Sequence, residues 1–189
     1  MSFEFATATR IVFGAGAASQ IAGEAKLLGK RALLVTGANP RRAERLLAEL
    51  YAAGVPAQIF QAIGEPATFT VEDGVAAAKE GNCDLVISIG GGSVIDAGKA
   101  IAAMMNNEGA LLDYLEIVGH GKPLLKPSAP FIAIPTTAGT GAEVTRNAVL
   151  ASPEHKVKVS LRSPHMLPRL AVVDPELTYD LPPGLTAST

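Results

Sequence analysis

The stretch Gly90-Gly91-Gly92-Ser93-Val94-Ile95-Asp96-Ala97-Gly98-Lys99 decides the fold of this chain. It follows an apolar run, residues 84–89, that predicts a buried strand, and it leads into residues 97–105, which predict a helix. A strand, a glycine turn and a helix N-terminus place backbone N–H groups and the helix dipole where an anion can bind. Ser93 is expected to cap the helix, with Asp96 in capping-box spacing. The stretch therefore predicts a phosphate-bearing ligand, with a dinucleotide as the leading candidate.

Strands and helices alternate on both sides of this stretch. The strands expected from apolar runs are residues 9–14, 31–36, 57–60, 85–89, 131–134 and 170–173. The helices expected from periodicity are residues 15–28, 40–53 and 71–80, with a short one at 111–115. Residues 145–151 and 156–161 predict an antiparallel pair around a turn at 152–155. This order predicts an α/β fold, a doubly wound, mostly parallel, Rossmann-like sheet with a β-hairpin extension.

Composition excludes several classes of function. The 189 residues carry a net charge of −2 and are 48% hydrophobic, which favours a folded core in one large or two small domains. The chain has no Trp and no basic run, which argues against nucleic-acid binding, and no apolar stretch of membrane-spanning length. The single cysteine, Cys83, and an N-terminus without signal-peptide features favour a reducing, cytoplasmic compartment.

Three further stretches are weaker candidates for ligand binding. Thr136, Thr137, Thr140 and Thr145 gather hydroxyls on a second glycine-bearing loop, for which an ordinary polar turn is the alternative. Residues 13–19 hold half of a dinucleotide fingerprint, and the alternative there is a tight turn. Residues 35–39, around Gly37, follow a strand end, where open α/β sheets bind ligands. The glycine stretch itself has an alternative reading, as a plain connection between a strand and a helix.

Catalytic and metal-ligating patterns are missing from the sequence. His120, His155 and His165 form no i, i+4 pair and have no acidic cluster beside them, so we expect them at the surface. Cys83 precedes a buried strand and is expected to pack. No Gly-x-Ser-x-Gly elbow and no Walker A loop occur. The sequence therefore predicts a binding site with no catalytic residue and no metal ligand.

Two segments together carry a family resemblance. Residues 90–100 and the stretch Pro135-Thr136-Thr137-Ala138-Gly139-Thr140-Gly141-Ala142-Glu143-Val144-Thr145 resemble the iron-containing (group III) alcohol dehydrogenases, and residues 172–178 with Leu181-Pro182 fit the same family. The resemblance runs from Arg10 onward. It implies a dehydroquinate synthase-like NAD(P)-binding domain over residues 1–180 and, at 181–189, the start of a helical domain. The residue pattern at 182–189 also predicts the start of a helix, with Thr186 as its cap. In the family that domain holds Fe²⁺ or Zn²⁺ through one Asp and three His, and none of the histidines here matches those ligands.

The resemblance also implies a role for individual residues. Gly90, Gly91, Gly92 and Ser93 would cradle the pyrophosphate of the dinucleotide, and Thr136, Thr137 and Thr140 would contact the pyrophosphate and the adenosine side. Asp96 would face the nicotinamide side of the cleft, and Thr145 and Lys158 would lie by the nicotinamide ribose. Residues Leu177 to Leu181 would wall the adenine pocket. Residues 3–13 would pair with a second copy in a homodimer.

One position departs from the NAD-preferring pattern of the family. Gly37 stands where such members often carry an Asp that accepts the adenosine ribose hydroxyls, and Arg41 and Arg42 follow it. This predicts that NADP is accepted as well as NAD or better. The activity implied is hydride transfer between a small alcohol or aldehyde and nicotinamide, with the isolated chain inactive. A related maleylacetate reductase, glycerol dehydrogenase or dehydroquinate synthase, and a non-catalytic nucleotide-binding module, remain as alternatives.

Overall fold

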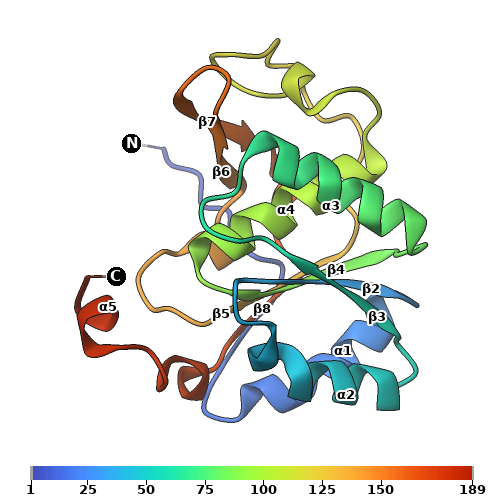
Figure 1. The fold of residues 1–189 in the computed structure, drawn as a ribbon, viewed down its shortest axis with the longest axis vertical. Coiled ribbons are helices and arrows are strands. Elements are labelled where there is room, and N and C mark those ends of the chain that lie inside the picture. The colour runs from blue at the N-terminus through green and yellow to red at the C-terminus, as the bar shows by residue number, and fades with distance from the viewer. Residues whose placement is uncertain (1, 189) are drawn as a thin grey trace.

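The computed structural model describes residues 2–188 and shows a parallel sheet between two helical layers (Figure 1). The sheet has six strands in the order β1-β8-β5-β4-β2-β3, and every neighbouring pair is parallel. Its strands are β1 (Ile11–Phe13), β2 (Ala32–Thr36), β3 (Ala57–Gln61), β4 (Leu85–Gly90), β5 (Phe131–Pro135) and β8 (Leu170–Val173). The predicted α/β fold with a doubly wound sheet is confirmed.

Alternating side chains of the strands build two cores. Ala32 and Leu34 of β2 face α1 (Ile21–Leu28) and α2 (Glu44–Ala52), which lie together on one side of the sheet. Leu33 and Val35 face α3 (Thr68–Glu80) and α4 (Gly92–Asn106) on the other side. Because all five residues of β2 are buried, its apolar run reflects burial on both faces, as a parallel sheet requires.

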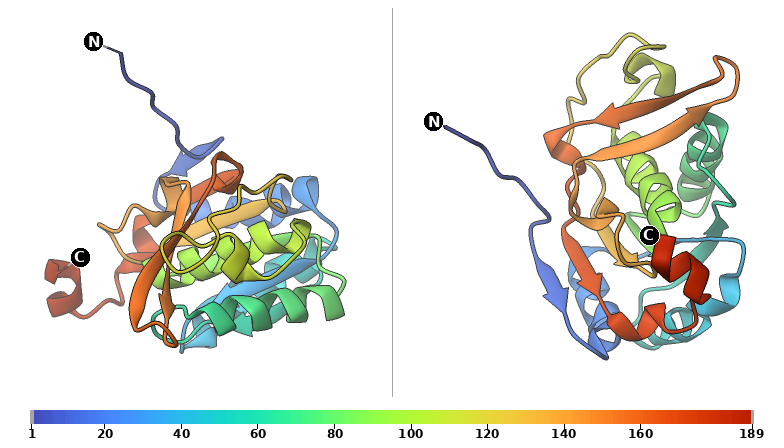
Figure 2. Two further views of the ribbon diagram at one scale, coloured as in Figure 1. Left: turned by 90° about the horizontal axis from the view of Figure 1, so that it is seen from above. Right: turned by 90° about the vertical axis from the view of Figure 1, so that its left-hand side faces the viewer.

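The predicted hairpin packs beyond α4. It consists of β6 (Asn147–Ser152) and β7 (Val157–Arg162), paired antiparallel, and its Ala148 and Leu150 belong to the same core as α4. Figure 2 shows this hairpin crossing over the layer of α3 and α4 and the N-terminal segment projecting from the body. Within residues 2–188, no helix combines the length and the apolar character that crossing a membrane needs.

Several boundaries differ from those predicted. The helix expected from residue 97 begins five residues earlier, at Gly92, and the one expected from residue 71 begins at Thr68. The helices expected from residues 15 and 40 open as 3-10 turns, Ala17–Gln20 and Pro40–Ala43, before α1 and α2. The short element at 111–115 is a single 3-10 turn, Leu111–Asp113. The ends of these helices depend on capping and on packing, and hydrophobic periodicity carries no information about either.

Candidate functional site

The carboxyl ends of β2, β4 and β5 surround a hollow of about 130 Å³. Gly37 and Arg42 line it from the segment after β2, and Gly90 and Gly91 line it from the turn after β4. Thr136 lines it from the end of β5 and donates its backbone N–H to the Gly90 carbonyl at 2.9 Å. Three stretches that are far apart in the sequence therefore meet at one edge of the sheet, where open α/β folds bind ligands.

The glycine turn leaves backbone donors open toward this edge. Gly91 is the N-cap of α4, and within residues 2–188 no side chain accepts a hydrogen bond at that cap. The first N–H groups of a helix have no partner inside it. A Cβ on Gly90 would lie 2.7 Å from Cβ of Val94, and one on Gly92 would lie 3.0 Å from Cγ2 of Thr140. The turn thus requires glycine and presents N–H groups and a helix dipole that suit an anion.

The predicted capping box is wrong. Ser93 lies inside the first turn of α4, so it cannot be the N-cap. The Asp96 carboxylate is turned away from that end, since its Oδ2 accepts a hydrogen bond from the backbone N–H of Val149 on β6 at 3.1 Å. Asp96 therefore accepts a hydrogen bond from a distant strand instead of from the N-terminus of its own helix. The predicted cap at Thr186 is also wrong, because this residue lies within α5 (Pro183–Ser188) and donates its hydroxyl to the Pro182 carbonyl.

Residues 136–141, called the threonine loop below, lie against the glycine turn. A Cβ on Gly91 would lie 3.6 Å from Oγ1 of Thr137, and Thr140 borders Gly92 as described above. The hydroxyls of Thr36 and Thr137 are buried and have no hydrogen-bond partner among residues 2–188. Buried hydroxyls are normally satisfied, so these two are free to bond a polar ligand at this edge. Thr36 lines the hollow and lies within residues 35–39, one of the weaker candidate stretches in the sequence.

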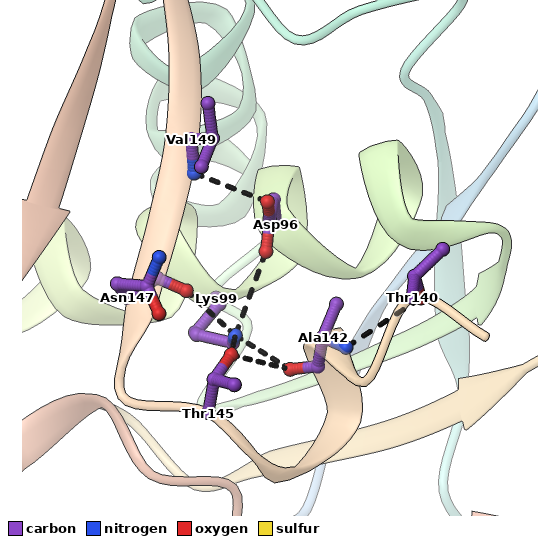
Figure 3. Close-up of polar contacts among 7 residues, drawn as sticks. All are labelled: Asp96, Lys99, Thr140, Ala142, Thr145, Asn147 and Val149. Atoms are coloured by element: carbon purple, nitrogen blue, oxygen red, sulfur yellow. Dashed lines mark hydrogen bonds and ion pairs between the residues drawn. The ribbon is translucent and has the colours of Figure 1, made fainter.

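Thr145 and Asp96 both contact the buried side chain of Lys99, and neither lines the hollow (Figure 3). Nζ of Lys99 lies 3.1 Å from Oγ1 of Thr145 and 3.5 Å from Oδ1 of Asp96. Burial lowers the pKa of Lys99 and raises the pKa of Asp96, while the attraction between them opposes both shifts.

Lys158 lies on β7 and forms an ion pair with Glu65 on the loop after β3, at 2.6 Å. Its side chain is 67% exposed and does not line the hollow. The other strand of the hairpin, β6, contacts the same loop through the Ala151 N–H, which donates to the Pro66 carbonyl at 2.8 Å. The hairpin is thereby attached to the edge of the sheet beside β3.

A second hollow, of about 240 Å³, adjoins the first and shares Arg42 and Ile89 with it. It is lined by Leu177, by Gly16 and by the buried Asp174, whose role the sequence pattern did not reveal. Leu181 does not line this hollow, and its N–H donates to the Thr178 carbonyl. The half-fingerprint at residues 13–19 is part of this wall, in which Gly16 has a φ of +76°.

Asp174 organises the wall of the second hollow. Its Oδ1 accepts hydrogen bonds from the N–H groups of Gly16 at 3.2 Å and Glu176 at 3.0 Å, and its Oδ2 accepts one from Ala18 at 2.9 Å. The carboxylate thus joins the loop after β1 to the chain that follows β8. These contacts explain why an Asp-Pro pair at the end of a strand matters here.

The histidines lie at the surface, as predicted. Nδ1 of His120 lies 3.1 Å from Oδ1 of Asp113, and Nδ1 of His155 lies 2.8 Å from Oγ of Ser152. Across residues 2–188, no group of three or more His, Cys, Asp or Glu side chains is placed to hold a metal ion. Cys83 packs against the core, and burial raises the pKa of its thiol.

A larger hollow, of about 1020 Å³, lies elsewhere, between α3 and the C-terminal end of α4. Val71, Val75 and Met104 line it, together with charged side chains such as Lys79 and Glu108. It contains no residue of the glycine turn or of the threonine loop. Size alone therefore does not mark the site to which the sequence points.

Comparison with known proteins decides the family. The family model described as iron-containing alcohol dehydrogenase matches residues 8–175. The chain belongs to this family. It is 39% identical over 183 residues to an NAD-dependent methanol dehydrogenase of Bacillus methanolicus, a match that covers 94% of this chain and 47% of the relative. The resemblance carried by the glycine and threonine stretches is thereby confirmed.

Solved structures of the family have the same fold. A 1,3-propanediol oxidoreductase superposes with a TM-score of 0.92 at 36% identity, covering 100% of this chain and 50% of that one. A sulfoacetaldehyde reductase from Bifidobacterium kashiwanohense, solved in complex with NAD⁺, superposes with a TM-score of 0.90 at 32% identity, again over 100% and 50%. The chain spans about half the length of the relatives it matches.

Proposed function

We propose that this chain binds a nicotinamide dinucleotide as the cofactor half of a metal-dependent alcohol dehydrogenase. The observation that carries the proposal is the uncapped N-terminus of α4 behind Gly90 and Gly91, at the carboxyl edge of a parallel sheet. The fold shared with a family member solved with NAD⁺ supports it. Residues 1–180 form the binding domain in this proposal, and residues 181–189 begin a helical domain.

The residues present fit the cofactor. N–H groups of Gly91, Gly92 and Ser93 would hold the pyrophosphate, and the unpartnered hydroxyls of Thr36 and Thr137 would complete its polar surroundings. Leu177, with Leu181 beyond it, would cover the adenine, and Thr145 and Lys158 would approach the nicotinamide ribose. The bound nicotinamide supplies the hydride acceptor or donor. The chain's own part is to bind and orient this group beside a small alcohol or aldehyde.

The described residues do not form a metal site, because the histidines are scattered over the surface and no acidic cluster accompanies them. We therefore derive no step through Fe²⁺ or Zn²⁺ in this chain. Ligands for the metal would come from the helical domain that the family adds. The relatives act on different substrates, as the names methanol dehydrogenase and 1,3-propanediol dehydrogenase state, so the proposed substrate is only a small alcohol or aldehyde.

Calorimetric titration tests the proposed function. The chain is titrated with NAD⁺ and with NADP⁺, each with and without Fe²⁺ or Zn²⁺. We expect binding that does not depend on the metal, and no turnover of alcohol by the chain alone. Absence of binding by both nucleotides would refute a cofactor half that works independently.

Gly37 provides a test of nucleotide preference. A Cβ at this position would meet only Cγ2 of Val94, at 3.5 Å, so an aspartate fits the backbone. Because Arg42 lines the same hollow, we propose that this end accepts the 2′-phosphate of NADP. Gly37→Asp should weaken NADP⁺ binding about tenfold or more through charge repulsion, with little change for NAD⁺. Equal losses for the two nucleotides, or tight NAD⁺ and no NADP⁺ binding by the unaltered chain, would contradict the assignment.

We further propose that the chain forms a homodimer through its N-terminal segment. We also propose a reducing, cytoplasmic compartment, which suits the single cysteine. The strand β1 pairs only with β8 among the described strands, and the exposed side chains near it include Phe3, Phe5 and Phe13, at 90%, 81% and 74% exposure. A free strand edge with exposed apolar side chains favours pairing with a second copy. Phe13→Lys should shift the chain toward monomer in sedimentation equilibrium. Tyr51→Lys, on the outside of α2, is the control and should leave the association constant unchanged.

A further inference from the structure

Lys99 is the most unusual side chain of the described chain, because it is charged yet only 1% exposed. It lies on α4, one helical turn after Asp96. Its Nζ donates to the backbone carbonyls of Ala142 at 2.6 Å and Asn147 at 2.7 Å, and to Oγ1 of Thr145 at 3.1 Å (Figure 3). An ammonium group has three N–H donors, so these three acceptors match it in number, and Oδ1 of Asp96 is a fourth, more distant acceptor at 3.5 Å.

All three acceptors belong to residues 142–147, which join the threonine loop to β6. Asp96 adds a fourth attachment through the Val149 N–H and lies 3.5 Å from the lysine, where it balances the charge. Glu143, from the same segment, also favours the charged lysine. The pair therefore binds a segment of irregular backbone to the rigid helix behind the glycine turn.

This pair is a costly way to gain stability. Burial lowers the pKa of Lys99 and raises the pKa of Asp96, so each charge is held against its desolvation. Replacing a buried ion pair with well-packed apolar side chains is often neutral or stabilising. What an apolar pair cannot do is fix two carbonyls and a hydroxyl at set positions. The cluster is thus better suited to positioning than to core stability.

The loop just before the segment that Lys99 holds contacts the glycine turn through Thr137 and Thr140. Gly139 and Gly141 have φ values of +124° and +65°, and Ala138 to Thr140 are exposed. Before it, the hydrogen bond from Thr136 to Gly90 attaches this loop; after it, Lys99 contacts the chain first, and the buried Ala142 and the hydrogen bond from the Ser163 N–H to the Arg146 carbonyl follow. Of these attachments, the one through Lys99 is the side-chain contact nearest to Thr137 and Thr140, so its loss should loosen their position beside Gly91 and Gly92.

We propose that Lys99 is a positioning residue, whose buried ammonium fixes residues 142–147 and thereby holds Thr137 and Thr140 against the glycine turn. Lys99 does not touch the nucleotide itself, because its ammonium is enclosed by the segment that it holds. This inference rests on the proposed nucleotide site for its functional consequence. The loop geometry that it invokes is independent of that proposal.

Hydrogen exchange together with calorimetry tests this role in the 189-residue chain. Lys99→Met keeps the length of the side chain and removes its donors. We expect amide exchange across residues 138–147 to become roughly tenfold faster or more while β4 and β5 stay protected. We also expect the Kd for NAD⁺ to rise about tenfold. Lys126→Met, a surface lysine paired with Glu108, is the control and should change neither quantity.

A milder variant keeps the test open if Lys99→Met does not fold. Thr145→Val removes one of the three acceptors, so we expect the same local pattern of exchange with a smaller amplitude. Faster exchange spread evenly over the whole sheet would overturn the proposal in favour of a general contribution to stability. Weaker NAD⁺ binding by Lys99→Met with unchanged exchange would overturn it in favour of direct contact. If the unaltered chain binds no nucleotide, the proposed function fails, and exchange in the loop alone still decides the role of Lys99.

Discussion

Asp174→Ala should lower the free energy of unfolding by about 3 kcal/mol, because three backbone N–H groups lose the carboxylate that satisfies them. Asp174 is 2% exposed, so water cannot easily replace its oxygens. The donors belong to Gly16, Ala18 and Glu176, which means that the loop after β1 and the chain after β8 both loosen. Urea unfolding followed by circular dichroism measures the change.

Asp180→Ala is the matched control for this substitution. Asp180 lies six residues further on, is exposed, and should leave the midpoint of unfolding unchanged. Asp174→Asn separates charge from shape, since its single amide oxygen can still accept from one side, and we expect an intermediate loss. A midpoint for Asp174→Ala equal to that of the unaltered chain would show that the three donors find other partners.

Gly90→Ala should weaken nucleotide binding roughly a hundredfold, by removing about two charge-assisted hydrogen bonds from backbone N–H groups. The added Cβ would lie 2.7 Å from Cβ of Val94, whose branched side chain is fixed on the first turn of α4. Either the end of β4 or that first turn must shift. The N–H groups of Gly92 and Ser93 then no longer converge on the phosphate.

Gly23→Ala provides the comparison for Gly90→Ala. Gly23 is exposed on α1, and nothing lies within 4 Å of a Cβ built there. We expect it to stabilise the chain by about 0.5–1 kcal/mol and to leave nucleotide affinity unchanged. Both Kd values are measured calorimetrically at a temperature where each variant is folded. Unchanged affinity in Gly90→Ala would mean that the phosphate is bound elsewhere.

The order of strands and helices could be predicted because each element is determined mainly by residues close together in the sequence. Apolar runs such as that of β2 and the helical spacing of α1 are each contained in fewer than a dozen residues. Boundaries depend on more distant contacts. The start of α4 was predicted too late because glycine disfavours helix in isolation, whereas packing of Val94 and Ile95 in the core outweighs that cost of about 1 kcal/mol per glycine.

The site could be predicted only in part, for a related reason. The rule that strand ends share one edge brings Gly37, Gly90 and Thr136 together, and the structure shows them lining one hollow. The contacts of Asp96 with Val149 and of Asp174 with Gly16 join residues 53 and 158 positions apart. Neither sequence spacing nor composition contains such pairings. The burial and the partners of Lys99 could not be predicted for the same reason, since its acceptors are mainly backbone carbonyls of distant residues.

The strand order also has a consequence for how the chain is made. Ile11 of β1 pairs with Ala171 of β8, so the strand of this sheet that is synthesised first can pair only after the strand that is synthesised last. Until β8 is synthesised, β5 is an outer strand with one side unpaired, and the N-terminal segment has no place in the sheet. Vectorial folding can therefore complete β2 to β5 first, and closure of the edge comes as a late, non-local step. A nascent chain stalled shortly before residue 170 is the form most exposed to mispairing with its neighbours on the polysome.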